Sequence, residues 1–381
     1  MSRARKRVAV IGATGSVGSS VLSVCRAHDD EIEVCALAAG SSLEKIEALG
    51  TELGARTLCL HDAPPDAPSN VLRGLEGLIA LAESPDVDHV VFASSGTAAI
   101  PALQAALRAG KDVSLANKES IVVAGPWVLP LVSRHDQLRP LDSEHNAIWQ
   151  CLHGEDASAL KSIYLTASGG PFRGWSIERL RSVTPEMALR HPVWSMGAKI
   201  TVDSATLMNK GIELIEAMFL FGLEPHQVHA LVSPGSFVHG LVELADGSVK
   251  MLAAAPDMRL PAASCLFWPQ RRWPAPDLEA PSLAQRSISF ELPDEVCFPA
   301  IRLAREAMER KGPYPAVLVG ADEVAVARFL EGRLRFTDIA IVVEEALASC
   351  PLSDPRSLED ALEALAWGRH RAGELCDGRA I

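Results

Sequence analysis

Two acidic residues stand close together in residues 140–146, which read Pro-Leu-Asp-Ser-Glu-His-Asn. In an extended backbone, alternate side chains point to the same side, so Asp142 and Glu144 would share one face. Paired carboxylates are hard oxygen ligands of the kind that Mg²⁺ and Mn²⁺ prefer. Ser143 and Glu144 also suit the start of a helix as capping residues, and from this segment alone that interpretation is the stronger one.

A second polar group falls on one face of an expected helix. Residues 203–222 have the pattern of a single long helix, and Asn209, Glu213 and Glu216 are spaced along it to lie on one side. Lys210 lies beside them. An amide, carboxylates and an ammonium on one flank form either a solvated surface or a site that holds a metal ion and a phosphorylated ligand.

The N-terminal segment predicts dinucleotide binding. Residues 8–18 read Val-Ala-Val-Ile-Gly-Ala-Thr-Gly-Ser-Val-Gly, the pattern of a strand, a glycine turn and a helix start. Gly12 permits the tight turn, Gly15 lets the backbone approach a pyrophosphate, and Gly18 lets the helix pack closely on the strand. The unpaired N–H groups at the start of the helix would bind the phosphates.

The end of the second expected strand indicates which dinucleotide binds. It reads Ala-Ala-Gly-Ser-Ser over residues 38–42, without an acidic residue for the adenosine ribose hydroxyl. That absence disfavours NAD and leaves room for the 2′-phosphate of NADP, although no Arg or Lys is present there either. Ser41 and Ser42 either donate hydrogen bonds to that phosphate or cap the next helix.

The cysteines argue against another enzyme class with this glycine turn, the semialdehyde dehydrogenases. Those enzymes need a nucleophilic cysteine in a shaped turn with a histidine partner. Cys151 falls in a helical run and Cys59 ends a strand, so neither has that setting. The eight cysteines form no Cys-x-x-Cys pair and fit buried positions in a reducing compartment, so we expect a cytoplasmic protein.

The order of the expected elements predicts an α/β fold. Strand patterns at 8–11, 32–37, 57–60, 89–92 and 112–115 alternate with helical patterns such as 16–27, 72–83 and 97–109. Such alternation indicates a Rossmann-like parallel sheet covered on both faces, with ligands at the carboxyl ends of its strands. Further on, a strand pattern at 161–166 and a hairpin pattern at 237–244 and 248–253 predict a second, α+β domain.

The sequence predicts four successive segments in the chain. We expect an NADP-binding domain at 1–142, a catalytic domain at 143–260, a proline-rich linker at 261–297 and a small helical domain at 298–381. The linker is expected because residues 256–299 hold eight of the 25 prolines, a density that disfavours helix. Helical patterns at 300–311, 322–332, 338–349 and 358–369 predict the last domain.

Composition excludes two classes of partner. A formal net charge of −12 over 381 residues disfavours nucleic acid, whose phosphates need a basic face. No run approaches the ~20 apolar residues of a membrane span, so no membrane partner is expected. A small phosphorylated substrate remains compatible, since a few local cations bind it.

The longer motifs resemble those of the 1-deoxy-D-xylulose 5-phosphate reductoisomerase family, NADPH-dependent enzymes of the methylerythritol phosphate route to isoprenoids. The family makes 2-C-methyl-D-erythritol 4-phosphate by rearranging its substrate to an aldehyde and reducing it. The resemblance runs in order over nearly the whole chain and rests on residues 12–18, 115–120, 142–148, 167–173, 191–197 and 202–211.

The resemblance implies a role for most polar residues of these motifs. A divalent metal, Mn²⁺ or Mg²⁺, would bind Asp142, Glu144 and Glu213. The substrate would contact Ser143, His191 and Trp194. Its phosphate would bind Ser168, Ser204, Asn209 and Lys210. The catalytic residues would be Lys118, Glu119, Glu144 and His191.

The resemblance also implies the cofactor contacts, a lid and a homodimer. NADPH would contact the glycine turn, the end of the second strand, the motif near residue 118 and the lid, through Gly12, Thr14, Gly15, Ser16, Val17, Gly40, Ser41, Ser42, Asn117, Glu119, Met196 and Gly197. The lid would span about 188–198, with hinges at Pro192 and Gly197.

Four segments depart from the family pattern. Residues 233–236 read Ser-Pro-Gly-Ser where His-Pro-Gln-Ser is usual, and residues 319–323 read Val-Gly-Ala-Asp-Glu where Asn-Ala-Ala-Asn-Glu is usual. Residues 312–315 and the Ser41-Ser42 pair are also atypical. These departures leave open a paralogue acting on a related phosphate or phosphonate ketone, and more remotely a non-catalytic dinucleotide-binding protein.

Overall fold

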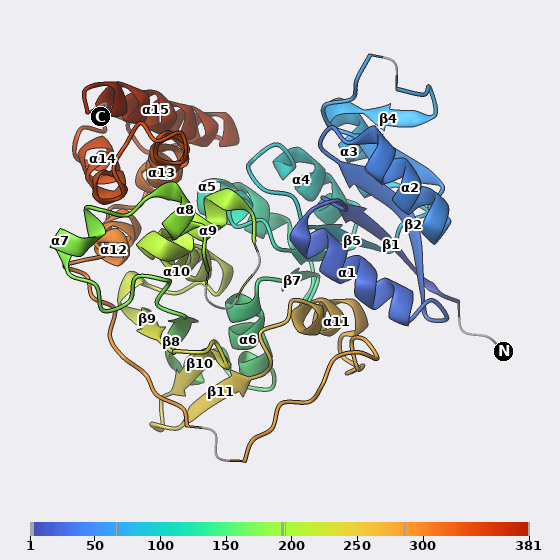
Figure 1. Ribbon diagram of the computed structural model, residues 1–381. Helices are drawn as coiled ribbons and strands as arrows, with labels where there is room; N and C mark the ends of the chain where they lie inside the picture. Colours follow the sequence, from blue (N-terminus) through green and yellow to red (C-terminus); the bar gives the residue numbers. More distant parts are fainter. Residues whose placement is uncertain (1–3, 66, 192–193, 195, 285–286, 380–381) are drawn as a thin grey trace. The chain divides into compact units, whose positions relative to one another are not determined.

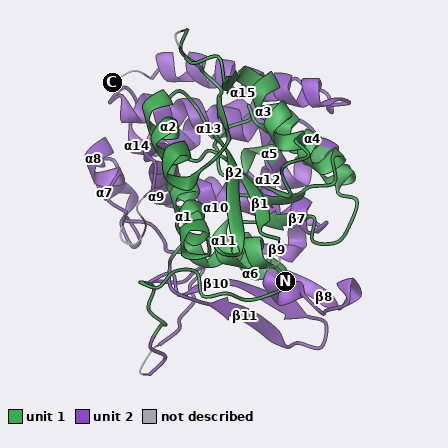
Figure 2. Cartoon of the chain, turned by 90° about the vertical axis from the view of Figure 1, so that its right-hand side faces the viewer, with its two compact units in different colours: residues 1–120, 128–149, 257–281 green, residues 121–127, 150–256, 282–381 purple. Residues whose placement is uncertain are grey.

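The computed structural model describes residues 4–379 except 66, 192–193, 195 and 285–286. Its contacts divide the chain into two compact units, which Figure 2 colours separately. Unit 1 comprises residues 1–120, 128–149 and 257–281, and unit 2 comprises residues 121–127, 150–256 and 282–381. Each unit is discontinuous in sequence, whereas the sequence patterns suggest successive domains.

Unit 1 is built on a seven-stranded parallel sheet with the order β4-β3-β2-β1-β5-β6-β7 (Figure 1). The strands are β1 (Lys6–Ile11), β2 (Ile32–Ala39), β3 (Thr57–Leu60), β4 (Val71–Arg73), β5 (His89–Phe92), β6 (Asp112–Leu115) and β7 (Leu138–Pro140). The predicted parallel sheet is confirmed, and β3, β5 and β6 have the predicted bounds. The three-residue strands β4 and β7 extend it at both edges.

The strand order reverses between β1 and β5, and in such sheets ligands bind at the carboxyl ends of the strands beside that reversal. The intervening helices are α1 (Ser16–Ala27), α2 (Leu43–Leu53), α3 (Gly74–Glu83), α4 (Ile100–Arg108), α5 (Glu119–Val128) and α6 (Ser143–Leu152). Val8, Val10, Leu22 and Leu37 are fully buried in the core between sheet and helices. The near-continuous burial of β1 and β2 explains their uninterrupted apolar runs.

The proline-rich segment contains a helix, so the prediction that its prolines exclude helix is wrong over α11 (Arg259–Phe267). Pro261 is the third residue of this helix, where the backbone N–H has no partner within the helix and proline is tolerated. Cys265 and Leu266 are fully buried in the core of unit 1. The apolar run of α11 therefore outweighs the proline count of the wider segment.

Unit 2 contains a four-stranded sheet with the order β11-β10-β8-β9. Its strands are β8 (Leu160–Ala167), β9 (Val228–Val232), β10 (Val238–Leu244) and β11 (Val249–Ala253). The predicted hairpin is confirmed, since β10 and β11 pair antiparallel. Short α-helices α7 (Ile177–Leu180) and α8 (Pro185–Ala188) follow β8, and 3-10 turns occur at Leu129–Leu131, Ala157–Ala159 and Pro225–Gln227.

The single helix predicted over residues 203–222 is wrong. Two helices, α9 (Ala198–Thr206) and α10 (Met208–Leu220), meet at Leu207, which has a left-handed φ of 63°. A leucine in that conformation is strained, and no sequence pattern indicates it. The break redirects the chain between Ser204 and Asn209.

Four helices complete unit 2: α12 (Ala300–Arg310), α13 (Tyr314–Leu330), α14 (Phe336–Ala348) and α15 (Leu358–Asp377). A Cβ atom at Gly320 of α13 would lie 2.3 Å from the carbonyl oxygen of Leu365, so α15 packs directly on its backbone. The atypical glycine at 320 thus has a packing role. No helix in the described part of the chain is both long and apolar enough to cross a membrane.

Two glycines of α15 should respond oppositely to alanine. Gly373 has open space around its Cβ position, so Gly373→Ala should raise stability by ~0.5–1 kcal/mol through helix propensity. A Cβ at Gly368 would lie 2.6 Å from the Val317 oxygen, so Gly368→Ala should lower the free energy of unfolding. Urea unfolding of the two variants measures both changes, and equal effects would contradict the α13–α15 packing.

Candidate active site

The glycine turn of unit 1 has no room for a side chain at two of its positions. Gly12 has a φ of 89°, and a Cβ there would lie 2.5 Å from the backbone of Ala93. A Cβ at Gly18 would lie 2.2 Å from the Gly12 oxygen, so α1 packs tightly on the turn. Gly15 precedes α1 and supplies no side-chain cap. The backbone at the start of α1 therefore suits a pyrophosphate, as the sequence predicts.

The end of β2 lies beside this turn. Gly12 N and Ala13 N each donate to the Ala38 oxygen at 2.9 Å. Gly40 and Ser41 are exposed, and Ser42 makes no side-chain cap to α2. Of the two roles left open for Ser42, capping of α2 is therefore not realised in the structure.

Asn117 connects two loops at the carboxyl ends of β5 and β6. Its Nδ2 donates to the oxygens of Ser94 at 2.8 Å and Gly96 at 2.7 Å, and its Oδ1 accepts from Ser120 N at 2.8 Å. The side chain, which is 1% exposed, thereby links the loops after β5 and β6. Its expected contact with the cofactor remains a prediction.

Asp142 and Glu144 lie at the start of a helix rather than on an extended strand, yet a carboxylate oxygen of each comes within 4.8 Å of the other, as the prediction of a shared side requires. Helix α6 begins at Ser143, and Glu144 lies in its first turn. Ser143 Oγ donates to Glu144 Oε2 at 2.5 Å, which fixes the orientation of that carboxylate. The helix start favoured by the local residue types is the observed structure.

A buried ion pair holds Asp142. Lys118 Nζ bonds to its Oδ2, and His145 Nδ1 lies 3.3 Å from the same oxygen. Burial by itself raises the pKa of Asp142, but Lys118 and His145 outweigh it and hold that pKa below its usual range. Because β6 and β7 are parallel neighbours, the loops after them bring Lys118 and Asp142 together.

Further acidic residues lie on α10 in unit 2. Glu213, which is 1% exposed, accepts hydrogen bonds from Asn209 Nδ2 and Lys210 Nζ. Glu216 on the next turn is equally buried. The predicted polar flank of the helix is thus buried, and the alternative of a solvated surface is wrong.

Ser168 and Ser204 are brought together by a close backbone contact. Gly170 N donates to Ser168 Oγ at 3.1 Å, and a Cβ at Gly170 would lie 2.8 Å from the Ser204 oxygen. The loop after β8 therefore packs directly on the end of α9. Since Leu207 joins α9 to α10, Asn209 follows within a few residues.

His191 presents a hydrogen-bond donor next to Ser168. Its Nδ1 accepts from Trp194 N at 2.8 Å, so the proton lies on Nε2, which is 3.3 Å from Ser168 Oγ. Burial lowers the pKa of His191 and favours this neutral form. Met196 and Gly197 are described, whereas the predicted hinge Pro192 lies outside the described residues.

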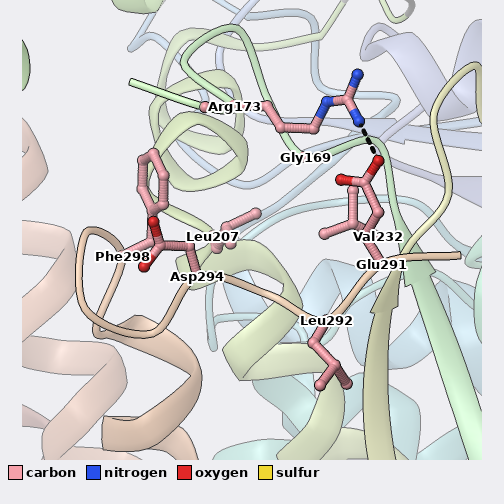
Figure 3. Close-up of a pocket in the computed structure, with 9 residues that line it drawn as sticks. Gly169, Arg173, Leu207, Val232, Glu291, Leu292, Asp294 and Phe298 are labelled. Atoms are coloured by element: carbon pink, nitrogen blue, oxygen red, sulfur yellow. Dashed lines mark hydrogen bonds and ion pairs between the residues drawn. The ribbon is translucent and has the colours of Figure 1, made fainter. Parts of the chain in front are cut away.

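A pocket of about 340 Å³ opens behind the Ser168 loop (Figure 3). It is lined by Gly169, Leu207, Val232 and the segment around Leu292. Arg173 reaches across to Glu291 with an ion pair of 2.8 Å, drawn as the dashed line in Figure 3. This pocket touches the loop and helix break that carry the predicted phosphate ligands.

The sequence patterns assigned no role to His145 or Lys199. His145 is fully buried against Asp142, three residues earlier, and that spacing on a helix was the available signal. Lys199 pairs with Asp203 four residues later and with Asp322 on α13. The second partner is 123 positions away, so no local pattern indicates it.

The parallel sheet and its glycine turn define the class of dinucleotide-binding α/β proteins, and this chain also has buried carboxylates. Models for 1-deoxy-D-xylulose 5-phosphate reductoisomerase match residues 8–125, for its C-terminal domain residues 138–221, and for the DXP reductoisomerase C-terminal domain residues 253–371. The chain belongs to the 1-deoxy-D-xylulose 5-phosphate reductoisomerase family.

Named relatives and solved structures agree with this membership. Relatives named 1-deoxy-D-xylulose 5-phosphate reductoisomerase include one from Desulfitobacterium hafniense, 43% identical over 97% of this chain and 99% of its own. Another from Pseudomonas syringae is 44% identical over 97% of both chains. The Zymomonas mobilis enzyme in complex with NADPH superposes with a TM-score of 0.89 at 38% identity, covering 98% of this chain and 100% of that chain.

Lys118→Met should expose the electrostatic role of the Lys118–Asp142 pair. Removing one partner of a buried pair costs about 3–5 kcal/mol at neutral pH. Lys118 depresses the pKa of Asp142, so its stabilisation is present at neutral pH and is lost as the pH falls through the folded pKa. In the variant Asp142 takes up a proton at a higher pH, so the loss should shrink between pH 7.5 and pH 5.

Urea unfolding at both pH values measures this difference. Lys118→Met combined with Asp142→Asn should recover part of the loss, because it leaves no unpaired charge. A pH-independent loss would show that Lys118 stabilises the loop through its aliphatic stem instead.

Proposed function

We propose that this chain converts 1-deoxy-D-xylulose 5-phosphate to 2-C-methyl-D-erythritol 4-phosphate with NADPH and a divalent cation. The observation that carries the proposal is the full-length family match together with a glycine turn shaped for a dinucleotide. Solved relatives at 37–38% identity are complexes with NADPH, in one case with fosmidomycin and magnesium. The isoprenoid precursor route is the corresponding pathway.

The cofactor is proposed to bind along the carboxyl ends of β1 and β2. The start of α1 would hold the pyrophosphate through backbone N–H groups, and the exposed Ser41 would face the 2′-phosphate. Met196 and Gly197 would contact the nicotinamide. The cofactor supplies the hydride, and the chain holds it in position.

The cation is proposed to bind Asp142, Glu144 and Glu213. Carboxylate oxygens fit Mg²⁺ or Mn²⁺, and the first of these carboxyls is held ionised by Lys118. When bound, the cation polarises the ketone and an adjacent hydroxyl of the substrate. Lys118 and Glu119 are proposed to lie beside those hydroxyls.

The substrate phosphate is proposed to bind the polar group around the end of α9. Ser168, Ser204 and Asn209 supply neutral donors, and the ammonium of Lys210 supplies the charge. Lys210 bonds to Glu213 in the structure, so it would turn toward the phosphate when the substrate enters. Neutral His191 would donate from Nε2 to the substrate, and Trp194 would cover it.

The alternative of a paralogue with a phosphonate ketone substrate is not favoured. The departure at Gly320 has a packing explanation, and Gly235 has a φ of 85° in the turn between β9 and β10, which suits glycine better than the usual glutamine.

We further propose that the chain is cytoplasmic and forms a homodimer. Light scattering of the purified chain would test the oligomeric state.

Purified protein should oxidise NADPH when Mg²⁺ or Mn²⁺ and 1-deoxy-D-xylulose 5-phosphate are present, and chelation of the cation should stop the reaction. Glu213→Gln should abolish turnover because it removes a carboxylate ligand, while the NADPH affinity stays within a few fold. Glu224→Gln, at an exposed ion pair, serves as the matched control. Full rate in Glu213→Gln would overturn the metal assignment, and turnover only of a phosphonate ketone would overturn the substrate.

Gly15→Ala should separate folding from cofactor binding. A Cβ there would lie 3.4 Å from the Gly12 oxygen, an ordinary contact, so the melting temperature of the apo protein should change little. The added methyl group would occupy the approach of the pyrophosphate and weaken NADPH binding by about tenfold or more. Fluorescence titration measures the affinity, and unchanged NADPH binding would refute the proposed phosphate position.

A further inference from the structure

We propose that Asp322 is a positioning residue that holds α9, and with it the phosphate-binding group, through Lys199. The inference rests on the proposed function for its kinetic consequence and on the geometry of unit 2 for its structural part. Asp322 lies on α13, far from Ser204 in sequence.

One ammonium joins the two helices. Lys199 Nζ lies 2.6 Å from Asp203 Oδ2, one turn further along α9, and 2.6 Å from Asp322 Oδ2 on α13. The first contact is within a helix and the second is between helices. Lys199 therefore ties the first turn of α9 to the middle of α13.

Burial makes this tie strong. The side chain of Asp322 is 0% exposed and that of Asp203 is 4% exposed, whereas Lys199 retains 34%. Among the described residues, Asp322 Oδ1 has no hydrogen-bond partner. Lys199 is thus the cation that compensates this carboxylate, and separating the two would leave a desolvated charge. Both pairs raise the pKa of Lys199 against the opposing effect of burial, so the ammonium stays charged.

The other end of α9 carries the phosphate-binding group. Ser204 lies five residues after Lys199, and its carbonyl oxygen would lie 2.8 Å from a Cβ at Gly170. Gly170 N bonds to Ser168 Oγ, so a shift of α9 displaces Ser168 as well as Ser204. Because α9 spans only nine residues, an anchor in its first turn controls the position of its last.

The negative charge at 322 is what pairs with Lys199, so the test variants alter that charge. An asparagine there could accept a hydrogen bond from Lys199 but would not pair with its charge. Asp322→Asn is therefore the conservative variant, which keeps the shape and the acceptor. Asp322→Ala removes the tie. If the alanine variant does not fold, Asp322→Ser is tested in its place, because the serine hydroxyl can bond within the helix.

Hydrogen exchange of the α9 amides tests the tie without substrate. Asp322→Ala should exchange about tenfold faster over residues 198–206 than the parent chain, and Asp322→Asn should fall near the parent. Glu323→Ala is the matched control, since it removes the neighbouring pair with Arg369 of α15 at 2.6 Å. Equal exchange over α9 in Asp322→Ala and Glu323→Ala would overturn the tie.

Steady-state kinetics test the effect on the phosphate. Asp322→Ala should raise KM for 1-deoxy-D-xylulose 5-phosphate and the inhibition constant of inorganic phosphate about tenfold, with KM for NADPH unchanged. Asp322→Asn should restore most of both. Faster exchange without these kinetic changes would overturn the positioning role. Absence of turnover in the parent chain would instead refute the proposed function, while the exchange result still decides the tie.

Discussion

Buried carboxylates set the main constraint on this molecule, since a desolvated charge is tolerated only beside an opposite one. Asp142 lies beside Lys118, Glu213 beside Lys210, and Asp322 beside Lys199. In unit 1 the pair joins the loops that follow two parallel strands. In unit 2 one pair lies within a helix and the other joins two helices. The elements must keep these positions, because each carboxylate depends on a cation from a fixed place in the fold.

Close backbone approaches complete the same arrangement. Gly18 allows α1 to pack on the glycine turn, and Gly170 allows the Ser168 loop to pack on the end of α9. At each point a methyl group would force the elements apart. The ion pairs therefore hold the charged side chains in place, while the glycines determine how closely the backbone segments pack. Together they place the start of α1 in unit 1 and the end of α9 in unit 2, the two anion-binding regions of the proposed function.

Most of unit 1 could be predicted from sequence because its signals are local. Short apolar runs and the glycine turn correctly predicted the bounds of β3, β5 and β6 and the start of α1. Three features escaped prediction for different reasons. β7 is a three-residue strand whose Arg139 and Pro140 have no strand pattern, and α11 has a proline that is harmless only in its first turn. The left-handed Leu207 is buried, and no residue type near it indicates the break.

The site residues also differ in whether local sequence indicates them. Residue types identified the carboxylates and the glycine turn, and the motifs supplied Ser168, Ser204 and Lys210. Some ion pairs join distant segments, as that of Asp322 with Lys199 does, and no local sequence spacing predicts them. The sequence thus indicates candidate groups for binding and chemistry, whereas the long-range contacts that hold them follow only from the fold.

The ammonium partners also bear on how a cation would enter. Lys118 and Lys210 keep Asp142 and Glu213 paired without any metal ion. A divalent cation binding these carboxylates would compete with the ammoniums, which costs affinity. Lys118 and His145 hold the pKa of Asp142 below its usual range, so that carboxylate need not lose a proton before a cation binds. On the proposed function, release from Glu213 would let Lys210 pair with the substrate phosphate, so cation and substrate binding would favour each other through one side chain.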